Sequence, residues 1–291
     1  MTLCYLNGDF LPIEQARISP LDRGFLFGDG AYELIPVYSR RAFRQEEHLR
    51  RLQQTLDGIR LNNPLDAERW QDLIARLIEQ APDEDQSIYL QVTRGADSKR
   101  DHAFPAAVEP TVFAYSAPLL TATAEQRARG VSCLSAVDNR WQRCDLKVLA
   151  LLPNVLLRQQ AVDAGCGEAI LLRDGYLTEG AASNIFVCRD GLLLAPPKGP
   201  LMLPGITYDV VLELAARHGM RHQLRAVSEA ELHSADEIWV TSSTREVMPC
   251  TTLDGQPVGH GATAGQPGPM ARQMYGWYCD FRDQVMRNSD G

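Results

Sequence analysis

Apolar and polar residues alternate with different periods along the chain, and each period indicates the secondary structure of its segment. Short alternating runs flank Asn7-Gly8, and this dipeptide between apolar runs is the strongest short-range signal of a β-hairpin. Apolar residues recur at every third or fourth position over about 46–59 and 67–81, which predicts two amphipathic helices. Strands are expected at 31–38, 88–93 and 111–115, and a long polar loop of the kind that carries function at 95–105.

In the second half of the chain, strand-like and helix-like segments alternate more regularly, without an internal repeat. Helices are expected near 150–164, 206–218, 228–233 and 270–286. Strands are expected at 131–137, 168–172, 184–188, 192–195, 237–241 and 247–252. The chain is therefore predicted to be α+β, or mixed α/β, in two domains. We expect a smaller N-terminal α/β domain at 1–119, an interdomain linker at 120–125 and a larger C-terminal domain at 126–291.

The composition of the 291 residues, 45% hydrophobic and 23% charged, is typical of a folded globular protein. The net charge of −8 leaves no excess of positive charge for phosphate backbones, which argues against nucleic-acid binding as the main function. Seven scattered cysteines without a C-x-x-C pair exclude a dense disulfide framework and offer no zinc spacing, so no metal is expected. Reduced thiols, with no signal-peptide pattern and no membrane-spanning apolar run, predict a cytoplasmic protein that binds no membrane.

Only three of the 29 basic residues are lysines, so few side chains offer an amine for chemistry. Lys147 stands among apolar residues, just before a predicted helix that has Pro153 in its first turn. An amine partly removed from water there has a lowered pKa and can form an imine with an aldehyde. The alternative is a lysine that reaches to solvent or pairs with Asp145. The other two, Lys99 and Lys198, lie in polar or Pro/Gly-rich loops that are typical of the surface.

Three further segments carry weaker chemical signals, and each also fits an ordinary turn or helix start. Glu179, between two predicted strands, is flanked by small residues, which suits a carboxylate that must approach a flat ring closely. Gly205 precedes a predicted helix whose free N–H groups and dipole favour an anion. Hydroxyl side chains at 241–244 offer donors where an apolar strand ends.

Taken together, these segments resemble one family, the class IV aminotransferases, which are pyridoxal-phosphate enzymes of fold type IV. The resemblance rests on residues 27–33, 47–52, 145–147, 178–180, 204–207 and 241–243, which match the family's motifs in the family's order and span most of the chain. Within the family the chain is most similar to bacterial D-amino-acid aminotransferases, because Arg100-Asp101-His102 matches their Arg-x-His motif. Residues 89–95, 139–145 and 165–171 strengthen that match.

The resemblance implies a two-domain fold with pyridoxal 5'-phosphate at the domain interface. Lys147 would carry the cofactor as a Schiff base and would then move the substrate proton as general base and acid. Glu179 would face the pyridine nitrogen and favour the protonated ring. Arg51, with Arg50 as the neighbouring alternative, would bind the phosphate. The remaining cofactor contacts would come from Leu203 against the ring and from Ile206, Thr207, Ser242 and Ser243 at or near the phosphate.

The resemblance also implies how the substrate is held. Tyr32, Arg100 and His102 would bind the substrate α-carboxylate, and their placement would select D over L amino acids. In the relatives the loop that bears the last two residues reaches into the partner subunit's site, so a homodimer is expected. The relatives carry serine where Ala181 and Ala182 stand, so a hydroxyl contact near the cofactor or substrate is missing here.

The expected activity is transamination of D-amino acids, such as D-alanine, with a 2-oxo acid acceptor such as 2-oxoglutarate or pyruvate. A branched-chain L-amino-acid aminotransferase has the same fold, although the Arg-x-His loop argues against it. A 4-amino-4-deoxychorismate lyase would eliminate pyruvate and need no amino acceptor. A binding protein that has lost the cofactor is a further alternative, against which Lys147 and Glu179 both argue.

Overall fold

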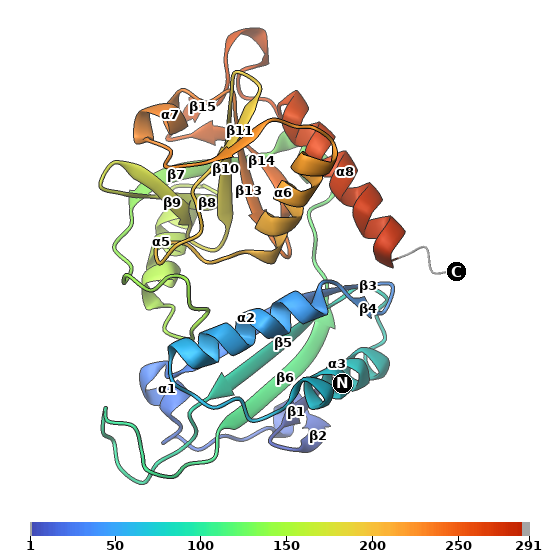
Figure 1. Ribbon diagram of the computed structural model, residues 1–291, viewed down its shortest axis with the longest axis vertical. Helices are drawn as coiled ribbons and strands as arrows, with labels where there is room; N and C mark the ends of the chain where they lie inside the picture. The colour runs from blue at the N-terminus through green and yellow to red at the C-terminus, as the bar shows by residue number, and fades with distance from the viewer. Residues whose placement is uncertain (1, 287–291) are drawn as a thin grey trace. The chain divides into compact units, whose positions relative to one another are not determined.

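Two β-sheets organise the chain, which the computed structural model describes over residues 2–286 (Figure 1). They belong to two compact units. The first unit runs to Leu120 and also includes Leu146–Leu151, and the second comprises Thr121–Asp145 and the chain from Leu152 onward. The sequence places all of 126–291 in one domain, but 146–151, with Lys147, belongs to the first unit because it pairs with a strand there.

The first sheet is antiparallel throughout, in the order β2-β1-β6-β5-β3-β4. The predicted hairpin is confirmed, because its two strands pair around Asn7 and Gly8, both of which have positive φ. The strand expected at 111–115 is longer than predicted, since it continues to Pro118, and it ends before the predicted linker at 120–125. The strands are β1 (Leu3–Leu6), β2 (Asp9–Pro12), β3 (Gly30–Tyr38), β4 (Arg41–Ala42), β5 (Gln86–Thr93) and β6 (Thr111–Pro118).

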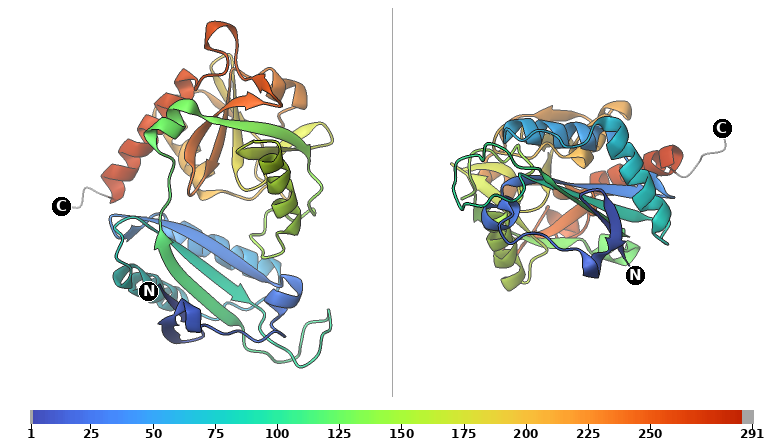
Figure 2. Two further views of the ribbon diagram at one scale, coloured as in Figure 1. Left: turned by 180° about the vertical axis from the view of Figure 1, so that it is seen from behind. Right: turned by 90° about the horizontal axis from the view of Figure 1, so that it is seen from below.

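Helices α2 (Gln45–Gly58) and α3 (Ala67–Gln80) pack on one face of this sheet (Figure 1). Their apolar stripes bury Leu52, Trp70 and Ile74 against Ile35 and Ile88, and the alternation along each strand selects the buried face. The left view of Figure 2 shows the other face of the sheet in front of α2. The short helices η1 (Ile13–Gln15) and α1 (Arg23–Phe27) precede β3.

The second sheet is mixed, in the order β12-β11-β10-β13-β14-β7-β8-β9, with β15 beside β14. Parallel pairs join β7 to both β8 and β14, and β11 to β12. The sequence indicates a turn around Glu179, but this residue lies on a strand, β9. The strands are β7 (Val131–Val137), β8 (Glu168–Arg173), β9 (Tyr176–Gly180), β10 (Asn184–Arg189), β11 (Leu192–Ala195), β12 (His222–Leu224), β13 (Glu237–Ser242), β14 (Glu246–Leu253) and β15 (Gln256–Pro257).

Helices surround this second sheet (Figure 1). α5 (Leu152–Asp163) packs on β7 and β8 through Leu157 and Ala161, and the stacked rings of Phe186 and Tyr208 join α6 (Ile206–Arg217) to the sheet. The predicted linker at 120–125 runs into α4, because Thr123 caps that helix. The remaining helices are α4 (Ala124–Arg129), α7 (Glu229–His233), η2 (Gly261–Thr263) and α8 (Pro269–Met286).

Candidate functional site

Lys147 lies on an extended segment that adds to the edge of β3. The Tyr32 N–H donates to the Lys147 carbonyl oxygen at 3.0 Å, and the Leu149 N–H donates to the Gly30 carbonyl oxygen at 3.0 Å. This antiparallel pairing places Lys147 and Tyr32 on the same side of the backbone. The Lys147 Nζ consequently lies 4.1 Å from the centroid of the Tyr32 ring.

Two glycines and a threonine allow residues 146–149 to pack closely against β3 and α2. A Cβ at Gly30 would lie 2.7 Å from Leu149 Cδ1, and a Cβ at Gly58 would lie 2.5 Å from Leu146 Cδ2. The Lys147 N–H donates to Thr55 Oγ1 on α2 at 3.2 Å. The backbone of Lys147 is therefore held from a strand and from a helix, which leaves its side chain as the part that can react.

The amine of Lys147 has no carboxylate partner among the described residues of its own unit. Asp145, which the sequence offered as an ion-pair partner, pairs instead with Arg143 at 3.1 Å. The amine therefore faces an aromatic ring and a half-buried environment. Such a group can bind a carbonyl compound covalently without first breaking a salt bridge within that unit.

Arg51 is fixed by a buried carboxylate on β3. Its Nε and Nη2 donate to the two carboxylate oxygens of Glu33 at 2.7 and 2.8 Å, and His48 Nδ1 lies 2.8 Å from Glu33 Oε2. Burial alone would raise the pKa of Glu33, but Arg51 and His48 hold that pKa well below its usual range. Burial lowers the pKa of His48. The two candidate phosphate ligands differ in burial, since Arg50 is exposed and Arg51 is buried.

The face of the first sheet that bears Tyr32 is aromatic. The Tyr32 and Tyr89 rings stack with their centroids 5.9 Å apart, and Tyr115 lies 5.5 Å from Tyr89. Burial raises the pKa of Tyr89 to about 12, and its hydroxyl donates to Gln91 Oε1 at 2.8 Å. The Lys147 amine therefore lies at the edge of an apolar, aromatic surface rather than among charges.

The structure brings Arg100 and His102 together on the loop after β5. The Arg100 guanidinium lies 5.0 Å from the centroid of the Phe27 ring, and the His102 ring lies 5.1 Å from the same ring. Both side chains are exposed. Within the described residues, neither makes a hydrogen bond or ring contact with Tyr32. Of the three residues proposed to bind the substrate carboxylate, Arg100 and His102 therefore lie on one loop, whereas Tyr32 lies apart from them on β3.

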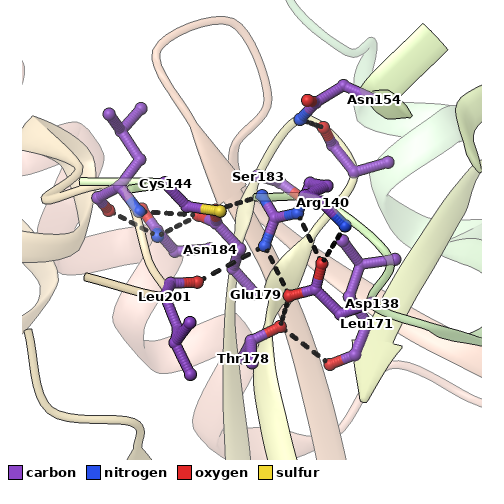
Figure 3. Close-up of polar contacts among 12 residues, drawn as sticks. Asp138, Arg140, Cys144, Asn154, Leu171, Thr178, Glu179, Ser183, Asn184 and Leu201 are labelled. Atoms are coloured by element: carbon purple, nitrogen blue, oxygen red, sulfur yellow. Dashed lines mark hydrogen bonds and ion pairs between the residues drawn. The ribbon is translucent and has the colours of Figure 1, made fainter. Parts of the chain in front are cut away.

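In the second unit, Glu179 projects from β9 into a buried polar cluster (Figure 3). Its carboxylate accepts hydrogen bonds from Arg140 Nη1 at 2.5 Å and from the Leu203 N–H at 3.1 Å, and Asn184 Nδ2 lies at 3.3 Å. Burial raises the pKa of Glu179 to about 7, while Arg140 and the Leu203 N–H act in the opposite direction. A second positive group beside the carboxylate, in addition to Arg140, would lower this pKa further and favour the ionised form.

Arg140 is held in turn by Asp138. The Arg140 Nε and Nη2 donate to the Asp138 carboxylate at 2.9 and 3.0 Å, and Thr178 Oγ1 donates to the same carboxylate at 2.9 Å. Arg173 lies 3.1 Å from Asp138. Figure 3 shows the Arg140 guanidinium between the two carboxylates. The position of Glu179 is thus set by a network of paired charges.

Asn184 connects Glu179 to the start of α6. Its Nδ2 donates to the Leu203 carbonyl oxygen at 3.0 Å, and its Oδ1 would lie 2.0 Å from a Cβ at Gly205. Gly205 caps α6 without a side-chain hydrogen bond, so the amides of the first turn, with those of Ile206 and Thr207, have no acceptor within the helix. This helix start is a set of N–H donors suited to an anion.

Arg140 and Asn184 were not predicted as site residues, although Arg140 lies in a segment, 139–145, that resembles the family. An arginine two residues after Asp138 and an asparagine at the start of a strand were the available signals. Arg140 is 39 residues from Glu179 and Asn184 is 19 residues from Leu203, so local sequence does not reveal these contacts. Of the predicted hydroxyls, Ser242 Oγ accepts from the Arg245 N–H at 3.1 Å in the turn after β13, where Ser243 also lies. Ala181 is buried, and its carbonyl accepts from Asn154 at 2.8 Å.

A metal centre and a membrane-spanning helix are two further features that residues 2–286 could contain. No group of three or more His, Cys, Asp or Glu side chains there could hold a metal ion. Among the helices of the same residues, none is long and apolar enough to cross a membrane.

The family model for amino-transferase class IV matches residues 30–253, which include β3, Lys147, Glu179 and the start of α6. The chain therefore belongs to the class IV aminotransferase family. It is 38% identical to D-alanine aminotransferase from Bacillus licheniformis over 268 residues, which cover 92% of this chain and 93% of that protein. It is 36% identical to D-alanine aminotransferase from Staphylococcus epidermidis over 275 residues, 94% of this chain and 95% of that protein.

Solved structures confirm the mixed α/β fold of fold-type IV aminotransferases. The branched-chain amino acid aminotransferase from T.th., solved with pyridoxamine 5'-phosphate, superposes with a TM-score of 0.89 at 25% identity, over 99% of this chain and 95% of that chain. The branched-chain amino acid aminotransferase from Escherichia coli also reaches 0.89, at 24% identity over 99% of this chain and 97% of that chain. The second likeness is one of fold alone.

Proposed function

We propose that this protein is a pyridoxal-phosphate-dependent aminotransferase that acts on D-amino acids, with D-alanine or a similar small D-amino acid as donor. The acceptor would be a 2-oxo acid such as 2-oxoglutarate or pyruvate. The observation that carries the proposal is the 38% identity with a D-alanine aminotransferase over nearly the whole of both chains. The Arg100-x-His102 sequence and its ordered loop support it.

The side chains that the structure describes fit this cofactor. Lys147 presents a primary amine without a carboxylate partner in its own unit, and such an amine can form an imine with an aldehyde. The start of α6 offers first-turn amides and the Thr207 hydroxyl, a donor set that suits a phosphate dianion. Glu179 is a buried carboxylate whose raised pKa would return toward its usual range beside a protonated ring nitrogen. We therefore assign these three places to the aldehyde, the phosphate and the ring nitrogen of the cofactor.

The remaining predicted ligands complete the proposal. Arg51 would bind the phosphate, with its orientation set by Glu33. Leu203 would pack against the ring, since its peptide N–H and C=O are fixed by Glu179 and Asn184. Ile206, Thr207, Ser242 and Ser243 would supply the other phosphate donors.

The protein's own residues would then divide the reaction among them. When bound, pyridoxal phosphate supplies the electron sink that accepts the electron pair left at the substrate Cα. Lys147 would take the substrate Cα proton as general base and would then donate a proton as general acid. Tyr32, Arg100 and His102 hold the α-carboxylate and so decide which face of Cα meets the lysine. The last two would reach the site of a second copy of the chain, so the active form would be a homodimer.

The half-reaction without acceptor tests this function. The protein loaded with pyridoxal phosphate is mixed separately with D-alanine and with L-leucine, and the absorbance band of the bound cofactor is followed. We expect the band to be lost with D-alanine alone. Loss with L-leucine alone would make the protein a branched-chain enzyme. A coloured protein that responds to neither would favour the lyase, for which release of pyruvate from aminodeoxychorismate is the direct assay.

A further inference from the structure

The loop that carries Arg100 and His102 is held by a buried arginine. Arg23, the first residue of α1, is only 4% exposed. Its Nη1 donates to the carbonyl oxygens of Asp101 at 2.6 Å and Ala103 at 3.2 Å, and its Nη2 donates to that of His102 at 3.2 Å. One guanidinium therefore binds three successive backbone carbonyls of the loop.

Asp29 joins this arginine to a second one. The Asp29 carboxylate accepts from Arg23 Nε at 2.8 Å and from Arg94 Nε and Nη2 at 2.8 and 3.0 Å. Burial alone would raise the pKa of Asp29, but Arg94 and Arg23 hold that pKa below its usual value. The carboxylate is therefore ionised at neutral pH and balances part of the charge of the two arginines.

Arg94 fastens the same loop to the end of α2. Its Nη1 and Nη2 donate to the carbonyl oxygens of Arg60 at 2.9 Å and Ile59 at 2.8 Å. Its guanidinium also lies 3.8 Å from the centroid of the ring of Phe104, the residue that directly follows the segment bound by Arg23. The loop is thus held in two ways, by Arg23 of α1 through its backbone and by Arg94 through the Phe104 ring.

The two proposed substrate ligands share a ring that belongs to this arrangement. Phe27, the last residue of α1, lies 5.0 Å from the Arg100 guanidinium, 5.1 Å from the His102 ring and 4.9 Å from the Arg23 guanidinium. Arg23 therefore contacts His102 directly, by a hydrogen bond to its carbonyl oxygen. It also contacts the Phe27 ring, against which the His102 side chain packs.

We infer that Arg23 is a positioning residue, and that with Asp29 and Arg94 it sets the Arg100–His102 loop before substrate arrives. Ordering a residue costs backbone entropy, and a loop that is already ordered does not subtract this cost from the binding energy of a carboxylate. The inference rests on the proposed function only in naming the ligand, since the ordering of the loop is a property of this chain.

The test compares Arg23→Gln with a matched surface variant, Arg17→Gln, in the cofactor-loaded protein. Arg17 also donates to backbone carbonyls of its unit, those of Glu14 and Ala16, but it is exposed and remote from the loop in sequence. Trypsin cleavage after Lys99 and Arg100 measures the order of the loop without any substrate. We expect Arg23→Gln to be cleaved there at least about tenfold faster, and Arg17→Gln to match the parent protein.

The kinetic result is a rise in KM for D-alanine of about tenfold or more in Arg23→Gln, with kcat and the affinity for pyridoxal phosphate changed by less than about threefold. Arg23→Lys should recover part of the KM and part of the resistance to trypsin. If Arg23→Gln does not fold, Asp29→Asn serves in its place, because it releases both arginines from their shared partner.

Unchanged cleavage, or faster cleavage with an unchanged KM, would overturn the inference. An equal fall in kcat and in cofactor affinity would show a merely structural role and would also overturn it. If the parent protein does not use D-alanine but Arg23→Gln alone is cleaved rapidly, the proposed function fails while the ordering of the loop by Arg23 stands.

Discussion

The Nζ of Lys147 lies 4.1 Å from the centroid of the Tyr32 ring because the backbones of the two residues are hydrogen-bonded to each other. This pairing ties the proposed reactive amine to β3, the same strand whose opposite face carries Glu33 and, through it, Arg51. One strand therefore sets the positions of a proposed covalent ligand and a proposed phosphate ligand in a single unit.

Replacing Lys147 with Ala should lower turnover with D-alanine by more than about a thousandfold, because no other amine replaces its proton transfer. Borohydride reduction should attach the cofactor to the parent protein but not to the variant, and mass spectrometry of the peptide that contains residue 147 detects the difference. Tyr32→Phe is the control, since it keeps the ring against the amine and should still be labelled. Full activity of Lys147→Ala would refute the mechanism.

Changing Glu179 to Gln should flatten the pH dependence of stability in the cofactor-free protein. The pKa of Glu179 is raised by burial from 4.5 to about 7, so in this window the folded protein binds a proton that the unfolded chain has lost. The stabilising contribution is full below the unfolded pKa and is lost as the pH rises through the folded pKa. Urea denaturation across this window, with parent and variant side by side, should show the stability of the parent falling relative to that of the variant as the pH rises. The opposite contribution of His48, whose pKa is lowered by burial, is common to both proteins.

Glu33→Gln should destabilise the protein by about 3–5 kcal/mol, because it leaves Arg51 buried without the charge that balances it. Glu47→Gln on the same helix as Arg51 is the matched control. Glu47 pairs with Arg44 at 2.8 Å where both side chains are partly exposed, and its loss should cost less than about 1 kcal/mol. Equal midpoints of urea denaturation for the two variants would show that the Glu33 pair is not the stronger interaction.

Gly205→Ala should weaken the binding of pyridoxal phosphate by roughly tenfold, or about 1–2 kcal/mol, by moving the start of α6. The backbone angles of Gly205 suit alanine, but the new Cβ would lie 2.0 Å from Asn184 Oδ1. Gly276→Ala in α8 is the control, because its Cβ would meet nothing within 4 Å. Spectroscopic titration of the cofactor-free proteins measures both affinities, and an unchanged affinity in Gly205→Ala would remove the phosphate from this helix start.

Much of the secondary structure could be predicted from the sequence because it follows from local periodicity. The helix expected at 46–59 is Gln45–Gly58, and the strands expected at 131–137 and 192–195 have those bounds in the structure. Lys147 was expected just before a helix, and α5 begins at Leu152. Elements too short to show a period, such as α1 and α4, were missed.

The segments that carry the candidate residues could also be found from the sequence, because their motifs are local. The partners of those residues could not. Glu179 meets Arg140 and Leu203, and Arg23 meets the carbonyls of 101–103, only because non-local packing brings separate segments together. The edge pairing that carries Lys147 into the first unit is of the same kind. Periodicity determines which face of an element is buried, whereas the order and register of the strands, set by packing across the whole unit, decide which charges meet there.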